Sequence, residues 1–170
     1  MIVGIDLGTT NSSVAVWQDG RAEIIPNALG HNLTPSVVGL DETGEILVGM
    51  AARERLITHP GQTAAVFKRY MGSPREFAVG RRKFRPEELS SFVLRALKAD
   101  AEAFLDAEVR EAVISVPGGV RLKRTGLQKP AIRHTSWRRE FAPLGEGGGA
   151  IELEILAAVE VAFLVEVIVN

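Results

Sequence analysis

The 170-residue sequence contains no cysteine. Disulfide bonds, thiolate nucleophiles and cysteine-ligated zinc are therefore excluded, and such a chain fits a reducing compartment such as the cytoplasm. The N-terminus lacks a basic segment followed by an apolar run, so we expect no signal peptide. A net charge of −1 gives no general argument for nucleic acid or membranes as partners. We expect a cytoplasmic protein with one core of ordinary size.

Long uncharged apolar runs are also missing. The most apolar stretch, residues 150–169, carries four carboxylates that cost too much free energy in hydrocarbon for a membrane span: Glu152, Glu154, Glu160 and Glu166. Acids are absent from residues 118–139, which hold seven cations. That segment could bind nucleic acid with a steep salt dependence, but its one aromatic residue, Trp137, offers little stacking surface. A solvated segment is therefore favoured, and nucleic acid is an unlikely partner.

The N-terminus, M-I-V-G-I-D-L-G-T-T-N-S-S-V-A-V-W, predicts a hairpin. β-branched residues favour strands over Ile2–Ile5 and Ser13–Trp17, and the polar turn Leu7–Ser12 separates them. Gly8 lets the turn approach a ligand closely, and three hydroxyl groups and an amide can donate to anionic oxygens. Asp6 ends the first strand, where a carboxylate can hold Mg²⁺ and its waters. These features indicate a phosphate-binding turn, with an ordinary polar hairpin as the alternative.

The run G-I-D-L-G-T-T-N-S-x-V-A-V resembles the phosphate loop of the heat-shock protein 70 (DnaK-type) chaperones. The resemblance implies an α/β fold, the actin-like (ribonuclease H-like) ATPase domain, which binds ATP or ADP with Mg²⁺. It places Asp6 on the Mg²⁺ shell through water and Gly8, Thr9, Thr10 and Asn11 on the β- and γ-phosphates. The shorter core D-x-G-T-T also occurs in sugar kinases, so another actin-like phosphotransferase stays an alternative.

Two more hairpin signals follow. Asp19-Gly20 is a turn signal before a strand over Ala22–Ile25, and a second hairpin joins Val37–Leu40 to Glu45–Val48. The pattern N-x-x-G-x-x-x-T-P-S-x-V, followed by V-G-x-x-A, resembles the chaperones and not the sugar kinases. Asn32 stands where that family usually has arginine.

The remaining patterns predict mixed helix and strand. The expected elements are helices over Ala51–Thr58 and Thr63–Tyr70, a strand and turn over Phe77–Phe84, a long helix from Arg85 to about Ala107 and a strand over Glu111–Pro117. Apolar residues of the long helix recur at three- and four-residue steps, so one face should lie in the core: Leu89, Phe92, Val93, Ala96, Leu97, Ala101, Phe104 and Leu105.

Two residues receive a role from the resemblance alone. Lys68 matches the K-R-x-x-G lysine that reaches the γ-phosphate and the attacking water, so Lys68 and Asp6 are the implied catalytic residues. A point charge on a flexible stem can stabilise a transferring phosphoryl group. Without the resemblance, Lys68-Arg69 is an ordinary solvated helix face. Pro117, after A-V-I-S-V, matches a conformational switch of the family, with a strand-ending proline as the alternative.

The resemblance covers residues 1–117 and then stops. Residues 118–139 have little helical periodicity, and 145–151 keep only an echo of the family's second glycine loop, with Gly145 and Ala150 in place of its Asp and Thr. We therefore expect a truncated first lobe, with a frame disruption as the hypothesis for the change after Pro117. Such a lobe should bind ATP weakly and hydrolyse it poorly if at all.

Two subdomains are expected. Residues 1–35 and 112–170 would form a partial phosphate-binding subdomain, and residues 36–111 an inserted α/β side subdomain. Unfolded polypeptides and co-chaperones are the partners implied for a full-length relative, and no membrane is expected. A chain without function is a further alternative, because the apolar strand within Ile155–Val169 has no evident partner and is a predicted aggregation site.

Overall fold

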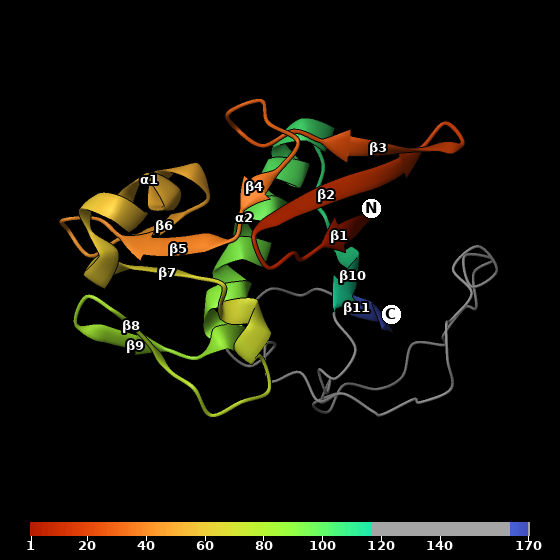
Figure 1. The fold of residues 1–170 in the computed structure, drawn as a ribbon. Helices are drawn as coiled ribbons and strands as arrows, with labels where there is room; N and C mark the ends of the chain where they lie inside the picture. Colours follow the sequence, from red (N-terminus) through yellow and green to blue (C-terminus); the bar gives the residue numbers. More distant parts are fainter. Residues whose placement is uncertain (117–163, 170) are drawn as a thin grey trace.

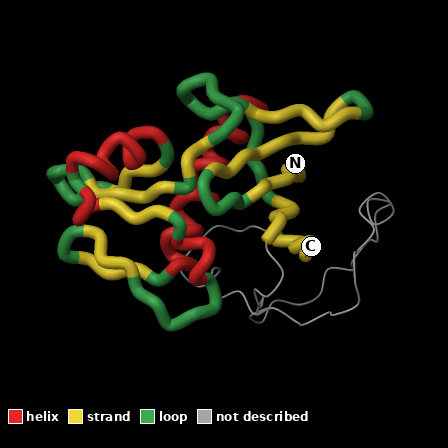
Figure 2. The backbone as a smooth tube through the Cα atoms, in the orientation of Figure 1, coloured by secondary structure: helices red, strands yellow, loops and turns green. Residues whose placement is uncertain are grey.

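The computed structural model describes residues 1–116 and 164–169 (Figures 1 and 2). The predictions for Pro117, for the basic residues 118–139 and for the glycine-rich residues 145–151 lie outside the described residues. The described part mixes helices with strands, so the α/β class is confirmed.

The larger sheet is built around the N-terminal strand. Its strands run in the order β11-β10-β1-β2-β3, and β4 pairs with β2. The bounds are β1 Ile2–Asp6, β2 Asn11–Gln18, β3 Arg21–Ile25, β4 Thr34–Pro35, β10 Glu111–Val116 and β11 Leu164–Val169. The predicted antiparallel meander is β1-β2-β3, and β10 lies parallel to β1. Asp6 thus ends a central strand, opposite Ser13 on β2.

The C-terminal strand corrects one expectation. Residues 164–169 form β11, which pairs in parallel with β10 from Glu111↔Leu164 to Val116↔Val169. The prediction that the apolar C-terminal stretch has no partner is therefore wrong for these six residues. The sequence pattern could not show this, because strand pairing depends on a register that only the folded sheet defines.

The smaller sheets hold the segment between β4 and the long helix. One has the order β6-β5-β7, and the other is the hairpin β8-β9. The bounds are β5 Val37–Leu40, β6 Ile46–Val48, β7 Thr63–Ala65, β8 Phe77–Val79 and β9 Arg82–Phe84, with the helix α1 at Met50–Thr58 and the 3-10 turns η1 at Pro60–Gln62 and η2 at Phe67–Tyr70.

The helix predicted over Thr63–Tyr70 is wrong. Thr63–Ala65 is strand β7, paired with β5, and only Phe67–Tyr70 is helical, as a single 3-10 turn. Val66 separates the two with a left-handed backbone, φ 59° and ψ 15°. That conformation breaks both helix and strand, and a β-branched residue rarely adopts it.

We expect Val66→Gly to stabilise the fold. Glycine adopts positive φ without steric cost, so the free energy of unfolding should rise by about 1 kcal/mol despite the larger backbone entropy of the unfolded chain. Val66 is 41% exposed, so little packing is lost. Urea denaturation measures the change. Val66→Ala is the control, since alanine keeps the Cβ and should gain less; equal effects of the two substitutions would contradict strain at Val66.

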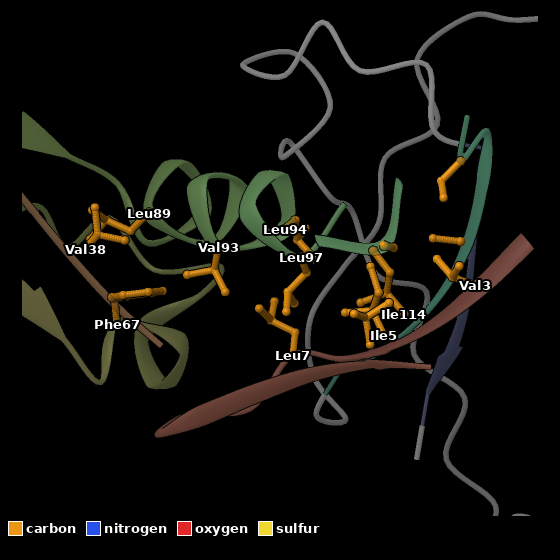
Figure 3. Packing of buried hydrophobic residues seen from close by; sticks show 14 of the residues in the cluster. Val3, Ile5, Leu7, Val38, Phe67, Leu89, Val93, Leu94, Leu97 and Ile114 are labelled. Carbon is orange, nitrogen blue, oxygen red and sulfur yellow. The ribbon is translucent and has the colours of Figure 1, made fainter. Parts of the chain in front are cut away.

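The long helix α2, Pro86–Leu105, joins the sheets through one core. Pro86 occupies the first turn, and the Glu88 carboxylate accepts the Arg85 backbone N–H at 2.6 Å. In Figure 3, Leu89 and Val93 lie toward Val38 and Phe67, whereas other residues of the helix lie toward the larger sheet. The predicted apolar face is confirmed at Leu89, Val93, Leu97 and Ala101, which are fully buried; Phe104 is 46% exposed.

Further along α2, the helix meets the start of the N-terminal turn. Leu94 and Leu97 lie beside Leu7, whose side chain is 1% exposed (Figure 3). The division into residues 1–35 with 112–170 and residues 36–111 stays a prediction, since a single cluster of buried residues runs through both parts. Within the described residues, neither α-helix combines the length and apolarity that a membrane span requires.

Candidate functional site

The turn between β1 and β2 is anchored at both ends and open in the middle. Leu7 is buried against α2 at the start, and Ser12 is buried at the end, each 1% exposed. Between them Thr10 is exposed, while Gly8, Thr9 and Asn11 are half-buried. The structure therefore brings the four residues predicted to bind phosphate onto one accessible turn, with their neighbours holding it to the core.

Gly8 is required by the shape of this turn. A Cβ at Gly8 would lie 1.8 Å from the Asn11 carbonyl oxygen, far inside any real contact. The chain thus doubles back on itself here, with the backbone of Asn11 against Gly8. A tight glycine turn with exposed and half-buried hydroxyl, amide and N–H groups beside it offers donors of the kind that bind phosphate oxygens. The residues present therefore fit a phosphate group.

Two serines support the turn from inside. The Gly8 N–H donates to the Ser12 hydroxyl at 3.1 Å, and the Ser36 hydroxyl donates to the Gly8 carbonyl at 2.8 Å. The prediction that the Ser12 hydroxyl is available to anionic oxygens is wrong, because this side chain is buried and hydrogen-bonded to Gly8 and Ser36. Ser36, the serine of the T-P-S motif, has no local sequence signal for this contact.

Lys68 reaches the same turn from η2, within the side region, by which we mean residues 36–111. Phe67, 1% exposed, is fixed in the core and meets Phe77 edge to face at 6.4 Å between ring centroids. Lys68 follows it, 9% exposed, and its Nζ donates to the Leu7 carbonyl. Burial lowers the pKa of the Lys68 ammonium, and the Asp6 carboxylate opposes that shift. Lys68 is therefore not a solvated helix residue: 61 positions apart in sequence, it and Leu7 are in contact.

Asp6 is the acid of the site. It is exposed at the end of β1 and close enough to Lys68 to influence its pKa. Across residues 1–116 and 164–169 no group of three or more His, Cys, Asp or Glu side chains could hold a metal ion. A single carboxylate suits Mg²⁺, which keeps several waters and takes further oxygens from a bound phosphate.

Comparison with known proteins decides the family. The model of the family described as Hsp70 protein matches residues 2–79 and 75–119. The chain belongs to the Hsp70 family. The chaperone protein DnaK of Thermotoga neapolitana is 48% identical over 118 residues, which make up 68% of this chain and 20% of that protein. The chain thus spans about a fifth of the length of this Hsp70 relative.

The Hsp70 match contains every candidate site residue. Asp6, the turn Gly8–Asn11, Ser36 and Lys68 all lie within residues 2–119, whereas the basic segment lies almost wholly beyond them. The match confirms the resemblance drawn from the sequence motifs. It also favours the Hsp70 family over the sugar kinases.

The buried Lys68 should make stability of this Hsp70-family chain depend on pH. Its pKa in the folded state is below the ordinary 10.5, so between these two values the unfolded chain binds more protons and stability rises with pH. Below the folded pKa the cost of burying the charge is fully present. Lys68→Met removes this charge, so its stability relative to the unmodified chain should decline steadily as the pH approaches 10.5. Urea midpoints from pH 7 upward measure this, and parallel profiles would contradict it.

Proposed function

We propose that the β1–β2 turn binds the β- and γ-phosphates of ATP or ADP, as part of the first lobe of an actin-like ATPase domain. The observation that carries the proposal is that Lys68 and Asp6 both lie at a turn whose shape requires glycine at position 8. Thr9, Thr10 and Asn11 supply the accessible hydroxyl, amide and N–H groups. Such donors suit phosphate oxygens, and a lysine beside them suits added negative charge.

Mg²⁺ completes the proposed ligand. Asp6 would hold water molecules of a Mg²⁺ ion bound to the phosphates, since this exposed carboxylate ends β1 directly before the turn. The metal would neutralise phosphate charge. Lys68 would stabilise the charge on the γ-phosphate, and Asp6 and Lys68 are the residues we propose as catalytic for ATP hydrolysis.

The wider role follows from the Hsp70 family and extends beyond this chain. We propose ATP-dependent chaperone activity for the full-length relatives, with unfolded polypeptides and co-chaperones as partners. The cytoplasm is the proposed compartment, since the absence of cysteine from this chain fits a reducing environment.

Isothermal titration calorimetry of the 170-residue chain with Mg-ATP tests the phosphate site. Thr10→Ala removes one exposed hydroxyl from the turn, so the dissociation constant should rise about fivefold. Thr58→Ala is the matched control, because it removes an exposed hydroxyl at the end of α1. No heat at millimolar nucleotide, or equal affinities in both variants, would count against the proposed function.

A further inference from the structure

We propose that Ser12 and Ser36 are positioning residues that close a ring of hydrogen bonds around Gly8 and so hold the phosphate turn in its binding shape. The proposal rests on the proposed function for its consequence, nucleotide affinity. The ring itself rests on geometry alone. Its three contacts are Gly8 N–H to Ser12 Oγ at 3.1 Å, Ser12 Oγ to Ser36 Oγ at 2.9 Å and Ser36 Oγ to the Gly8 carbonyl at 2.8 Å.

Proton counting fixes the direction of every bond in the ring. A carbonyl oxygen cannot donate, so the single proton of the Ser36 hydroxyl goes to Gly8. The Ser12–Ser36 bond must then use the proton of Ser12. Ser12 in turn accepts from the Gly8 N–H. Each hydroxyl therefore donates once and accepts once, and such chains of hydrogen bonds strengthen one another.

Burial makes the ring costly to open. Ser12 and Ser36 are each 1% exposed. An alanine at position 12 would leave the Gly8 N–H without its acceptor, and an alanine at position 36 would leave the carbonyl without its donor. Gly8 is half-buried, so water can replace a lost partner only in part, and leaving either group unpaired costs part of its desolvation penalty. The turn would regain these bonds only by moving, and its ligand-facing groups would move with it.

The ring also links the turn to the segment that follows it. The Ser36 N–H donates to the Thr10 carbonyl at 2.9 Å, and β4 immediately before it pairs with the start of β2 (Figure 1). Ser36 leads directly into β5, and the strand β7 paired with β5 leads to Lys68. Two residues of the side region therefore contact consecutive carbonyls, Lys68 that of Leu7 and Ser36 that of Gly8. A shift of this region would reach the phosphate turn through both contacts.

Nuclear magnetic resonance of the Gly8 amide tests the ring directly in the full chain. Ser12→Ala should remove the acceptor of that amide, change its chemical shift and speed its hydrogen exchange about tenfold or more. Ser36→Ala should change the chemical shift of the same amide, because the loss of the Ser36 hydroxyl opens the ring. Ser91→Ala is the matched control: Ser91 is 2% exposed and its hydroxyl donates to the Glu88 carbonyl within α2, so a buried hydroxyl is lost without touching the turn.

Affinity for Mg-ATP gives the second measurement. Ser12→Ala and Ser36→Ala should each raise the dissociation constant about tenfold, and the double variant little more, because either substitution opens the same ring. Ser91→Ala should change it by less than about twofold. A Gly8 amide unchanged in both serine variants overturns the ring. An amide that responds in a chain that binds no Mg-ATP supports the ring but overturns the proposed phosphate role.

Discussion

Gly8→Ala is expected to abolish Mg-ATP binding and to lower the free energy of unfolding by about 3 kcal/mol. The added Cβ would lie 1.8 Å from the Asn11 carbonyl oxygen and 3.0 Å from the Asn11 carbonyl carbon. Both are backbone atoms, so no side-chain rotation relieves the clash. The turn must open, and opening it separates Gly8 from Ser12 and Ser36. Urea denaturation and calorimetry with Mg-ATP measure the two effects.

Gly4→Ala is the matched control for this substitution. Gly4 lies in β1, four residues earlier, and a Cβ there would meet the Ala15 carbonyl oxygen at an ordinary 3.9 Å. Its stability should change by less than about 1 kcal/mol, and its affinity should be unchanged. A folded Gly8→Ala variant that still binds Mg-ATP would show that the turn does not need its present shape.

Most of the strands could be predicted because their signals are local. The meander β1-β2-β3 follows from β-branched runs and an Asp-Gly turn, and the hairpin β5-β6 follows in the same way. The face of α2 was predictable from its spacing, since burial of one helix face needs only a period near 3.6. The two-residue strand β4 was missed, because a bridge this short has no pattern of its own.

The segment containing Lys68 shows where local reasoning fails. Thr63–Tyr70 has no residue that forbids a helix, and the interruption is a left-handed valine, a conformation that sequence preferences argue against. Pairing of β7 with β5 and burial of Phe67 impose it. Tertiary contacts thus override local preference next to a candidate site residue, which is where strained backbone is most often found.

The candidate site likewise contains residues that a local motif locates and residues that only the folded structure brings together. Asp6 and the turn residues 8–11 are contiguous, so a motif can locate them, and Lys68 was assigned by resemblance to the family. The partnership of Ser12 with Ser36 spans 24 residues and leaves no periodic signal. Both serines look like ordinary polar turn residues in the sequence. Only the packed structure shows that their hydroxyl groups are used internally.

Lys68→Ala is expected to weaken Mg-ATP binding far more than Mg-ADP binding. A charge-assisted hydrogen bond to the γ-phosphate contributes about 1.5 to 3 kcal/mol, so the dissociation constant for ATP should rise about 10- to 150-fold. ADP lacks the γ-phosphate and should lose less than about threefold through the longer electrostatic interaction. The Lys68 ammonium must leave the neutral Leu7 carbonyl to reach a phosphate. The anionic γ-phosphate then offers this buried ammonium a stronger hydrogen-bond partner.

Two further variants separate charge from structure in that experiment. Lys68→Met keeps most of the side-chain volume, so a fold weakened by a cavity in Lys68→Ala would be preserved while the charge is still lost. Arg69→Ala removes the exposed cation beside Lys68 and should leave the preference for ATP over ADP unchanged. Equal losses for the two nucleotides in Lys68→Met would place Lys68 away from the γ-phosphate. A loss of affinity confined to ATP in Lys68→Met, and absent from Arg69→Ala, would place the Lys68 ammonium on the γ-phosphate.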